Sequence, residues 1–169
     1  MTSVNILGIT IEKRKPHEVI QPEDFNKKKK ILLKIIEKLE DISEPVNSDI
    51  NMKIDEIKLD ILALPTVSYG DAVFASHHND IVNILVKIAN ILSELYGDIL
   101  AVLEIKEEVK KLPTVGFGDI VLARHHNSIV NILKKIADLL EDLIELSSEV
   151  VLWDDVEVKL YYPPSEEGK

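Results

Sequence analysis

The chain has 169 residues, of which 46% are hydrophobic, so it can close one core as a single domain without disulfides or a structural metal. It contains no cysteine, which excludes a disulfide scaffold, a thiolate zinc site, an iron–sulfur cluster and a thiol nucleophile. The net charge of −10 argues against a protein that coats nucleic acid, because that affinity comes largely from neutralising phosphates.

The N-terminal segment has the composition of a β-strand. Residues 4–11 are rich in β-branched side chains, which predicts a strand within residues 1–15. No apolar run in the sequence approaches the roughly 18 residues that a membrane helix needs, and the N-terminus lacks a basic flank followed by an apolar signal region. We therefore expect no membrane partner and no secretory signal.

Helical periodicity dominates the middle of the chain, where apolar residues recur at spacings of three and four. The pattern predicts three long helices, within residues 22–44, 76–96 and 123–143, and two shorter ones, over residues 50–61 and 98–111. Gly97 leaves open whether the helix over residues 98–111 continues the one before it.

The C-terminal segment is again typical of β-structure. Residues 149–153 and 156–162 are rich in β-branched and aromatic side chains and flank Asp154-Asp155, which predicts a hairpin over residues 149–162 and a loose tail over residues 163–169. The predicted fold is mainly α. It is a bundle of about three long and two shorter helices, with a small antiparallel sheet formed by the N-terminal and C-terminal strands.

Two long segments of the chain are copies of each other. Residues 64–92 and 112–140 are identical at 20 of 29 positions, at an offset of 48. A weaker third copy, residues 20–26, aligns without a gap with residues 73–79 and 121–127, at an offset of 53 from the second copy. Within one domain, 1–169, we therefore predict three repeat units of about residues 17–63, 64–111 and 112–147.

The pairs His77-His78 and His125-His126 are the residues that point to metal or acid–base chemistry. The first unit carries Asp24 and Phe25 at these positions, and a phenyl ring cannot bind an ion. We interpret the position of Phe25, His78 and His126 as a packing site for a flat ring, and the position of Asp24 as a capping site. We predict no catalytic, cofactor-binding or metal-binding residue, and metal binding or catalysis is the less favoured alternative.

Asn26, Asn79 and Asn127 are identical in the three units although both neighbours of each change. The position therefore requires a carboxamide. Pro22 marks a helix start, where an amide can donate and accept at once and tie the preceding extended stretch to the helix. The alternative is that the amide binds a ligand.

Asp71 and Asp119 each follow a glycine, which predicts a turn before a short extended stretch. A phosphate-binding loop needs more glycine than this, and the sequence contains neither a dinucleotide-binding nor a Walker motif. It also lacks the nucleophile-elbow and zinc-protease motifs.

Charge is divided between the two ends of the chain. Residues 12–38 hold nine Lys and Arg and five Asp and Glu, a net charge of +4, whereas residues 137–169 hold ten acids and two bases. The run Lys27, Lys28, Lys29 and Lys30 is interpreted as a solvated helix face that can serve as an assembly patch, with nucleic-acid binding as the less favoured alternative. The 23 isoleucines, with abundant Lys and Glu, are compatible with a thermophilic source.

The second unit, Tyr69-Gly70-Asp71-x-Val73-x-Ala75-x-His77-His78-Asn79-x-x-Val82-x-x-Leu85, resembles short helix-initiating repeats in tail and other virion structural proteins of bacteriophages and archaeal viruses. Residues 18–26 resemble the same repeats in a weaker form. The resemblance covers about a third of the chain, and the terminal strands have no counterpart in it. It implies an assembly role, with no catalytic residues to carry over.

These observations together predict a non-enzymatic structural virion protein, part of a capsid or tail and made in the host cytoplasm. We expect it to self-assemble through its repeats and terminal strands and to contact other virion proteins. If the units stack in order, the first and third helices are the outer ones, and their opposite charges predict salt-sensitive association. The alternatives are a protein- or ligand-binding helical module and, less favoured, a His-dependent metal protein.

Overall fold

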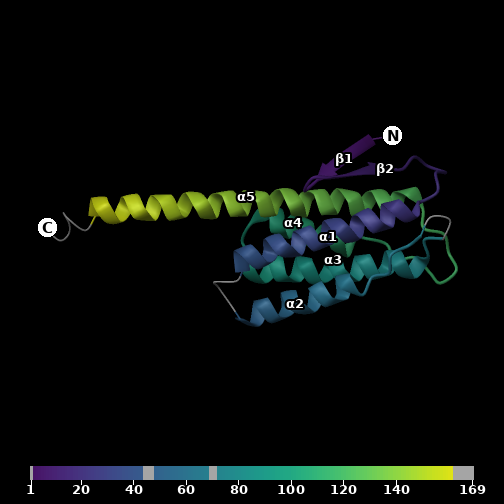
Figure 1. Ribbon diagram of the computed structural model, residues 1–169, viewed down its shortest axis with the longest axis horizontal. Coiled ribbons are helices and arrows are strands. Elements are labelled where there is room, and N and C mark those ends of the chain that lie inside the picture. The colour runs from purple at the N-terminus through teal and green to yellow at the C-terminus, as the bar shows by residue number, and fades with distance from the viewer. Residues whose placement is uncertain (1, 44–47, 69–71, 162–169) are drawn as a thin grey trace.

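The computed structural model describes residues 2–43, 48–68 and 72–161, with side chains described up to residue 146. In this part of the chain the elements are the strands β1 (Thr2–Ile6) and β2 (Ile9–Lys13) and the helices α1 (Pro22–Ser43), α2 (Ser48–Leu62), α3 (Ala75–Tyr96), α4 (Leu100–Lys110) and α5 (Ala123–Tyr161). The predicted class, a mainly helical bundle with a small antiparallel sheet, is confirmed (Figure 1).

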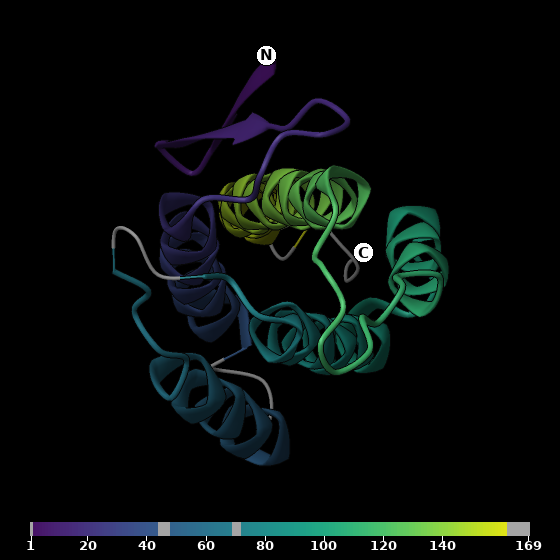
Figure 2. The same ribbon diagram turned by 90° about the vertical axis from the view of Figure 1, so that its right-hand side faces the viewer.

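The three long helices α1, α3 and α5 run side by side and begin at the same end of the molecule (Figure 1). The other elements form an outer layer. Helix α2 packs against α1 and α3, α4 packs against α3 and α5, and the β1–β2 hairpin packs against α5 and α1 (Figure 2). Because α1 also contacts α5, the expectation that the units stack in a row, with these two helices outermost, is wrong. The chain closes into a ring.

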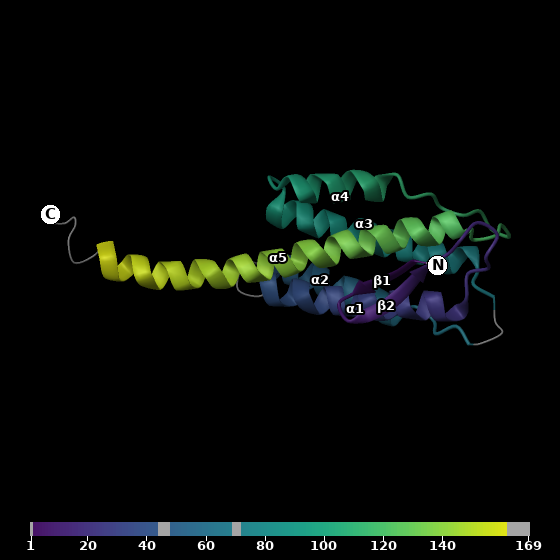
Figure 3. The same ribbon diagram turned by 90° about the horizontal axis from the view of Figure 1, so that it is seen from above.

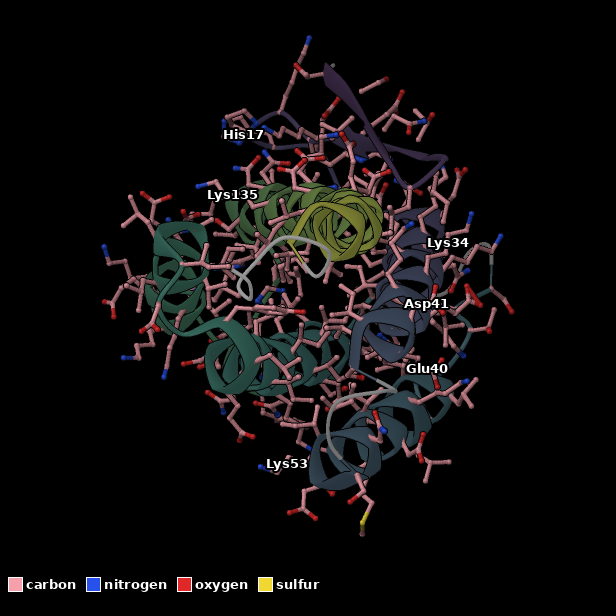
Figure 4. The ribbon with its side chains drawn as sticks, turned by 90° about the vertical axis from the view of Figure 1, so that its left-hand side faces the viewer. His17, Lys34, Glu40, Asp41, Lys53 and Lys135 are labelled. Atoms are coloured by element: carbon pink, nitrogen blue, oxygen red, sulfur yellow. The ribbon has the colours of Figure 1, made fainter. Side chains whose placement is uncertain are left out.

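The core of the ring is the apolar stripe of each long helix. In α1, Ile31, Leu32, Ile35 and Leu39 are each fully buried, and the corresponding isoleucines and leucines of α3 and α5 meet them along the axis. Burying one such side chain stabilises a fold by about 1.5–3 kcal/mol. Lysines such as Lys34 and Lys53 lie on the outside of the bundle in the end view of Figure 4.

The N-terminal segment folds as a hairpin of its own. Strands β1 and β2 pair antiparallel from Thr2↔Lys13 to Ile6↔Ile9. Leu7 and Gly8 connect them with φ angles of 52° and 84°, the two positive values that a tight type I′ turn requires. The single strand predicted within residues 1–15 is therefore two strands.

The predicted C-terminal hairpin over residues 149–162 is wrong, because α5 continues to Tyr161. The sequence contains no glycine or proline between Ala123 and Tyr161, so nothing in the backbone chemistry ends the helix once it has begun. The strand-like residues lie inside a helix whose preceding turns are held by packing, and tertiary context overrides their weak propensity. The sequence left open whether α3 and α4 are continuous, and in the structure they are separate helices on either side of Gly97.

Three equivalent lysines join each long helix to the outer element that precedes it in the chain. Lys87 of α3 bonds Asp60 of α2 at 2.5 Å, and Lys135 of α5 bonds Glu108 of α4. Lys34 of α1 donates to the backbone oxygen of Leu7, in the hairpin, at 3.1 Å. Each pair is 27 residues apart. These contacts connect each of the three long helices in the same way to the element that precedes it.

Candidate functional site

The three asparagines make the same pair of hydrogen bonds. Asn26 Nδ2 donates to Val67 O at 2.8 Å, and Asn26 Oδ1 accepts from Val67 N at 2.9 Å. Asn79 bonds Val115 in the same way, at 2.7 and 2.8 Å. Asn127 does so with Arg14, at 2.7 and 2.8 Å. We call each of these pairs of bonds a clamp.

The clamps join neighbouring units. The carboxamide was expected to bind the extended stretch before its own helix, and that expectation is wrong. Asn26 and Asn79 hold the stretches that lead into the next long helix, 41 and 36 residues further along the chain. Asn127 holds the stretch that leads into α1, 113 residues away, and so joins the start of α5 to the start of α1. We call these stretches, residues 14–21, 64–68 with 72–74, and 112–122, the lead-in segments.

The residue two positions before each asparagine caps its own helix. Asp24 Oδ2 accepts from the backbone N–H of Gln21 at 2.8 Å. His77 Nδ1 and His125 Nδ1 accept from the backbone N–H of Phe74 and Leu122, each at 2.9 Å. The three contacts span the same number of residues, and they satisfy donors that a helix start leaves free. This position therefore has the capping role expected from the sequence.

The residue just before each asparagine points into the centre of the ring. Phe25, His78 and His126 are buried, with exposed fractions of 1%, 2% and 0%. The ring centroids of Phe25 and His77 lie 5.0 Å apart, and those of His78 and His125 lie 5.4 Å apart, so rings of neighbouring units pack together. The flat-ring packing expected for this position is therefore present at Phe25 and His78, and His126 is buried at the equivalent position.

Both central histidines are neutral and present a lone pair. His78 Nε2 bonds Pro113 O at 3.0 Å and His126 Nε2 bonds Glu12 O at 2.7 Å, and a carbonyl can only accept, so Nε2 carries the proton in each ring. Both Nδ1 atoms are buried, and neither has a hydrogen-bond partner among the residues that the structure describes. Burial lowers the pKa of His78 and of His126 to about 4.

A buried lysine completes the centre. Lys28 is 3% exposed, at the position that isoleucine occupies in α3 and α5. Burial lowers its pKa to about 7, and the charge of Asp24 opposes part of that shift. Asp24 is itself held by Arg14, with Nε and Nη2 at 2.9 and 2.8 Å from the two carboxylate oxygens. The expected solvated face of four lysines is therefore wrong at Lys28.

The other three lysines of the run have different surroundings. Lys27 pairs with Glu23 at 3.1 Å, and Lys29 donates to Leu64 O at 2.6 Å. Lys30 is exposed. A uniform assembly patch over Lys27–Lys30 does not exist.

The three lead-in segments enclose an apolar hollow at the end of the bundle where α1, α3 and α5 begin, which is the end that faces the viewer in Figure 2. Its volume is about 900 Å³. Equivalent residues of the three segments line it, with exposed apolar side chains at its rim: Val19, Phe74, Phe117 and Ile120. We call this hollow the cup, and sequence reasoning did not anticipate it.

The turn at the rim has the geometry expected from the Gly-Asp pair. Asp119 N donates to Gly116 O at 2.9 Å, and Gly118 has a φ of 84°. Asp119 is exposed and lines the cup. Asp71, its counterpart in the second unit, lies outside the described residues.

Within residues 2–43, 48–68 and 72–161, no group of three or more His, Asp or Glu side chains is placed to hold a metal ion. In the same part of the chain no helix combines the length and apolarity needed to span a membrane. Comparison of the chain with family models, with curated proteins and with solved structures finds no match.

Proposed function

We propose that this chain is a non-enzymatic structural protein of a virus or virus-derived particle, made in the host cytoplasm and incorporated into the virion by self-association. The resemblance of its repeats to helix-initiating repeats of virion proteins supports this role. The hydrogen bonds of the repeats support it as well, because the side chain of each asparagine binds the backbone of another segment of the chain.

One observation carries the proposal: the apolar side chains around the cup are exposed to solvent. Phe117 is fully exposed, and Val19, Phe74 and Ile120 expose 72%, 60% and 78% of their surface. Exposed apolar side chains gathered around a hollow are typical of surfaces that bind a partner. A structural subunit buries this surface when it assembles.

Light scattering of the purified chain tests the proposal. We expect fixed oligomers or large particles at high protein concentration and low salt. Raising the ionic strength should slow their formation, because exposed charges are screened over about 10 Å at 0.1 M salt. A protein that remains monomeric across pH 5–8 under these conditions would overturn the proposal.

The runner-up is a helical module that binds another protein or a small ligand, and the volume of the cup, about 900 Å³, favours it. A monomer that binds apolar compounds or peptides in the cup would favour this reading over self-assembly. A metal protein is the less favoured alternative, to which the two free Nδ1 lone pairs of His78 and His126 would contribute. Stoichiometric zinc, copper or nickel in protein purified without a tag or added metal would support it.

A further inference from the structure

Helix α5 extends beyond the other helices at the end of the bundle opposite the cup (Figure 3). Helices α1 and α3 end at Ser43 and Tyr96, and the offset of 48 places the equivalent position of α5 at Ile144. The helix continues to Tyr161, which adds about 25 Å of length at 1.5 Å per residue. We call residues 145–161 the tip.

The sequence of the tip is apolar as well as acidic. Eight of its last twelve residues are Val, Leu, Trp or Tyr, and residues 149–161 contain four acids and one lysine. A helix this apolar is normally covered. Leu146, the last residue whose side chain is described, is already 56% exposed. The cup and the apolar sequence of the tip therefore lie at opposite ends of the long axis of the molecule (Figure 3).

We propose that the tip of one copy of this chain docks in the cup of the next copy, so that subunits join head to tail. This inference rests on the proposed self-assembly and names its contact. Two turns of a helix about 10 Å wide and 11 Å long occupy roughly 900 Å³, which is the volume of the cup. The last two turns of the tip match the cup in size.

Charge complementarity favours a second copy as the occupant. Among the described residues, the cup itself is lined by one charged side chain, Asp119, and the hollows that adjoin it are lined by the exposed bases Lys30 and Arg124. The tip carries the opposite sign to these two bases. Cup and tip are different surfaces at opposite ends of the molecule, so the contact is heterologous and repeats from subunit to subunit. The product is a filament, or a ring if the rotation between subunits closes.

Two full-length variants test the contact. Ile120→Asp places a charge on the cup at a residue that is 78% exposed, and Val156→Glu with Leu160→Glu places charges on the tip. Each variant should lose assembly by light scattering and keep the melting temperature and helix content of the wild-type chain. The matched control, Leu59→Glu, changes a residue that is 67% exposed on the side of the bundle and should assemble as the wild type does.

Mixing the two variants gives the decisive result. The cup variant keeps an intact tip and the tip variant keeps an intact cup, so together they should form a 1:1 complex of two 19.1 kDa chains that grows no further. If Ile120→Asp lowers the melting temperature, Val19→Asp on another lead-in segment replaces it.

The possible failures are distinguishable. Variants that assemble like the wild type, or a mixture that forms no complex, would overturn the tip–cup contact and leave self-assembly standing. A wild-type chain that stays monomeric would overturn the proposed function, and the contact with it. Binding of an apolar peptide in the cup of such a monomer would identify a different occupant.

Discussion

The start of α1 and the starts of α3 and α5 make the same backbone contacts with different side chains. At the central positions α1 carries Asp24, Phe25 and Lys28, where the other two helices each carry two histidines and an isoleucine. The clamp and the cap are nevertheless the same at all three starts. The ring therefore depends on the clamping amide and the capping acceptor, and its centre tolerates a change of chemistry.

The start of α1, which carries the different side chains, is also the place where the clamp of Asn127 closes the ring. Two of the clamps join segments 36 and 41 residues apart, whereas the clamp of Asn127 joins segments 113 residues apart. The Arg14–Asp24 ion pair lies beside this long-range junction, since Arg14 is also the residue that Asn127 holds. Closing a longer loop costs more conformational entropy, and the extra ion pair offsets part of that cost.

Breaking the ion pair should have the largest effect. Asp24→Ala removes the carboxylate that pairs with Arg14 and that lies near the buried Lys28, and it removes the cap of α1. We expect a loss of about 3–5 kcal/mol in the free energy of unfolding, measured by chemical denaturation at pH 7. The control, Glu23→Ala, removes the exposed partner of Lys27 and should lose less than about 1 kcal/mol. Equal losses in the two variants would show that the buried pair has no special role.

Acid should destabilise the protein through the two helix starts that carry a buried histidine. The pKa of His78 and of His126 is about 4 in the folded chain, below the usual 6.5, so the unfolded chain binds more protons between these values. Stability is therefore lost as the pH falls from 6.5 to 4, by about 2–4 kcal/mol for each histidine.

Replacing a central histidine by phenylalanine sharpens this test, because Phe25 already occupies the equivalent position. His78→Phe should fold at pH 7 and should lose less stability than the wild type between pH 6.5 and 4. Denaturation curves at both pH values measure the difference. If the loss of stability in acid is unchanged in both His78→Phe and His126→Phe, the two buried histidines are not its cause.

Removing a clamp should have a smaller effect that is similar in all three units. Asn26→Ala, Asn79→Ala and Asn127→Ala each leave a backbone N–H and C=O without the bonds described above, and we expect losses of about 1–3 kcal/mol. Asn83→Ala, on the exposed face of α3, is the matched control and should change stability by less than about 0.5 kcal/mol. Melting temperatures unchanged from wild type in all three clamp variants would remove the basis for the ring.

The sequence alone identifies these asparagines but not their partners. Self-comparison of the chain is enough to find Asn26, Asn79 and Asn127, because their neighbours change and they do not. Their partners lie 36 to 113 residues away, and no local pattern reports that one unit holds the next. The same offsets of 48 and 53 relate Val115, Val67 and Arg14, so a search for equivalent positions could have placed the partners once one was known.

Two other features escape a local reading for different reasons. The tip has the β-branched composition of a strand, and only its continuity with a packed helix makes it helical. Lys28 belongs to a run of four lysines that looks solvated, yet the helical spacing of its apolar neighbours Ile31, Leu32 and Ile35 places it on the buried stripe. Weighing periodicity above residue type at that position would have predicted its burial.

Removing the buried lysine should have the smallest effect on the free energy of unfolding, and this effect should be stabilising. Lys28→Met keeps the length of the side chain and removes a charge whose pKa is lowered by burial from 10.5 to about 7. The unfolded chain binds more protons than the folded chain between these values, so the stability of the wild type rises with pH across that window. We expect the variant to be more stable by about 1–2 kcal/mol at pH 7, and the advantage to shrink as the pH rises and to vanish only near the unfolded pKa of 10.5.

The same variant should also change the histidines, because the charge of Lys28 contributes to lowering the pKa of both His78 and His126. Histidine resonances followed by NMR during an acid titration should therefore shift at a higher pH in Lys28→Met than in the wild type. Lys30→Met, at an exposed position two residues along α1, provides the control and should leave both titrations in place. Identical histidine titrations in Lys28→Met and wild type would place the ammonium group of Lys28 too far from both histidines to affect their pKa values.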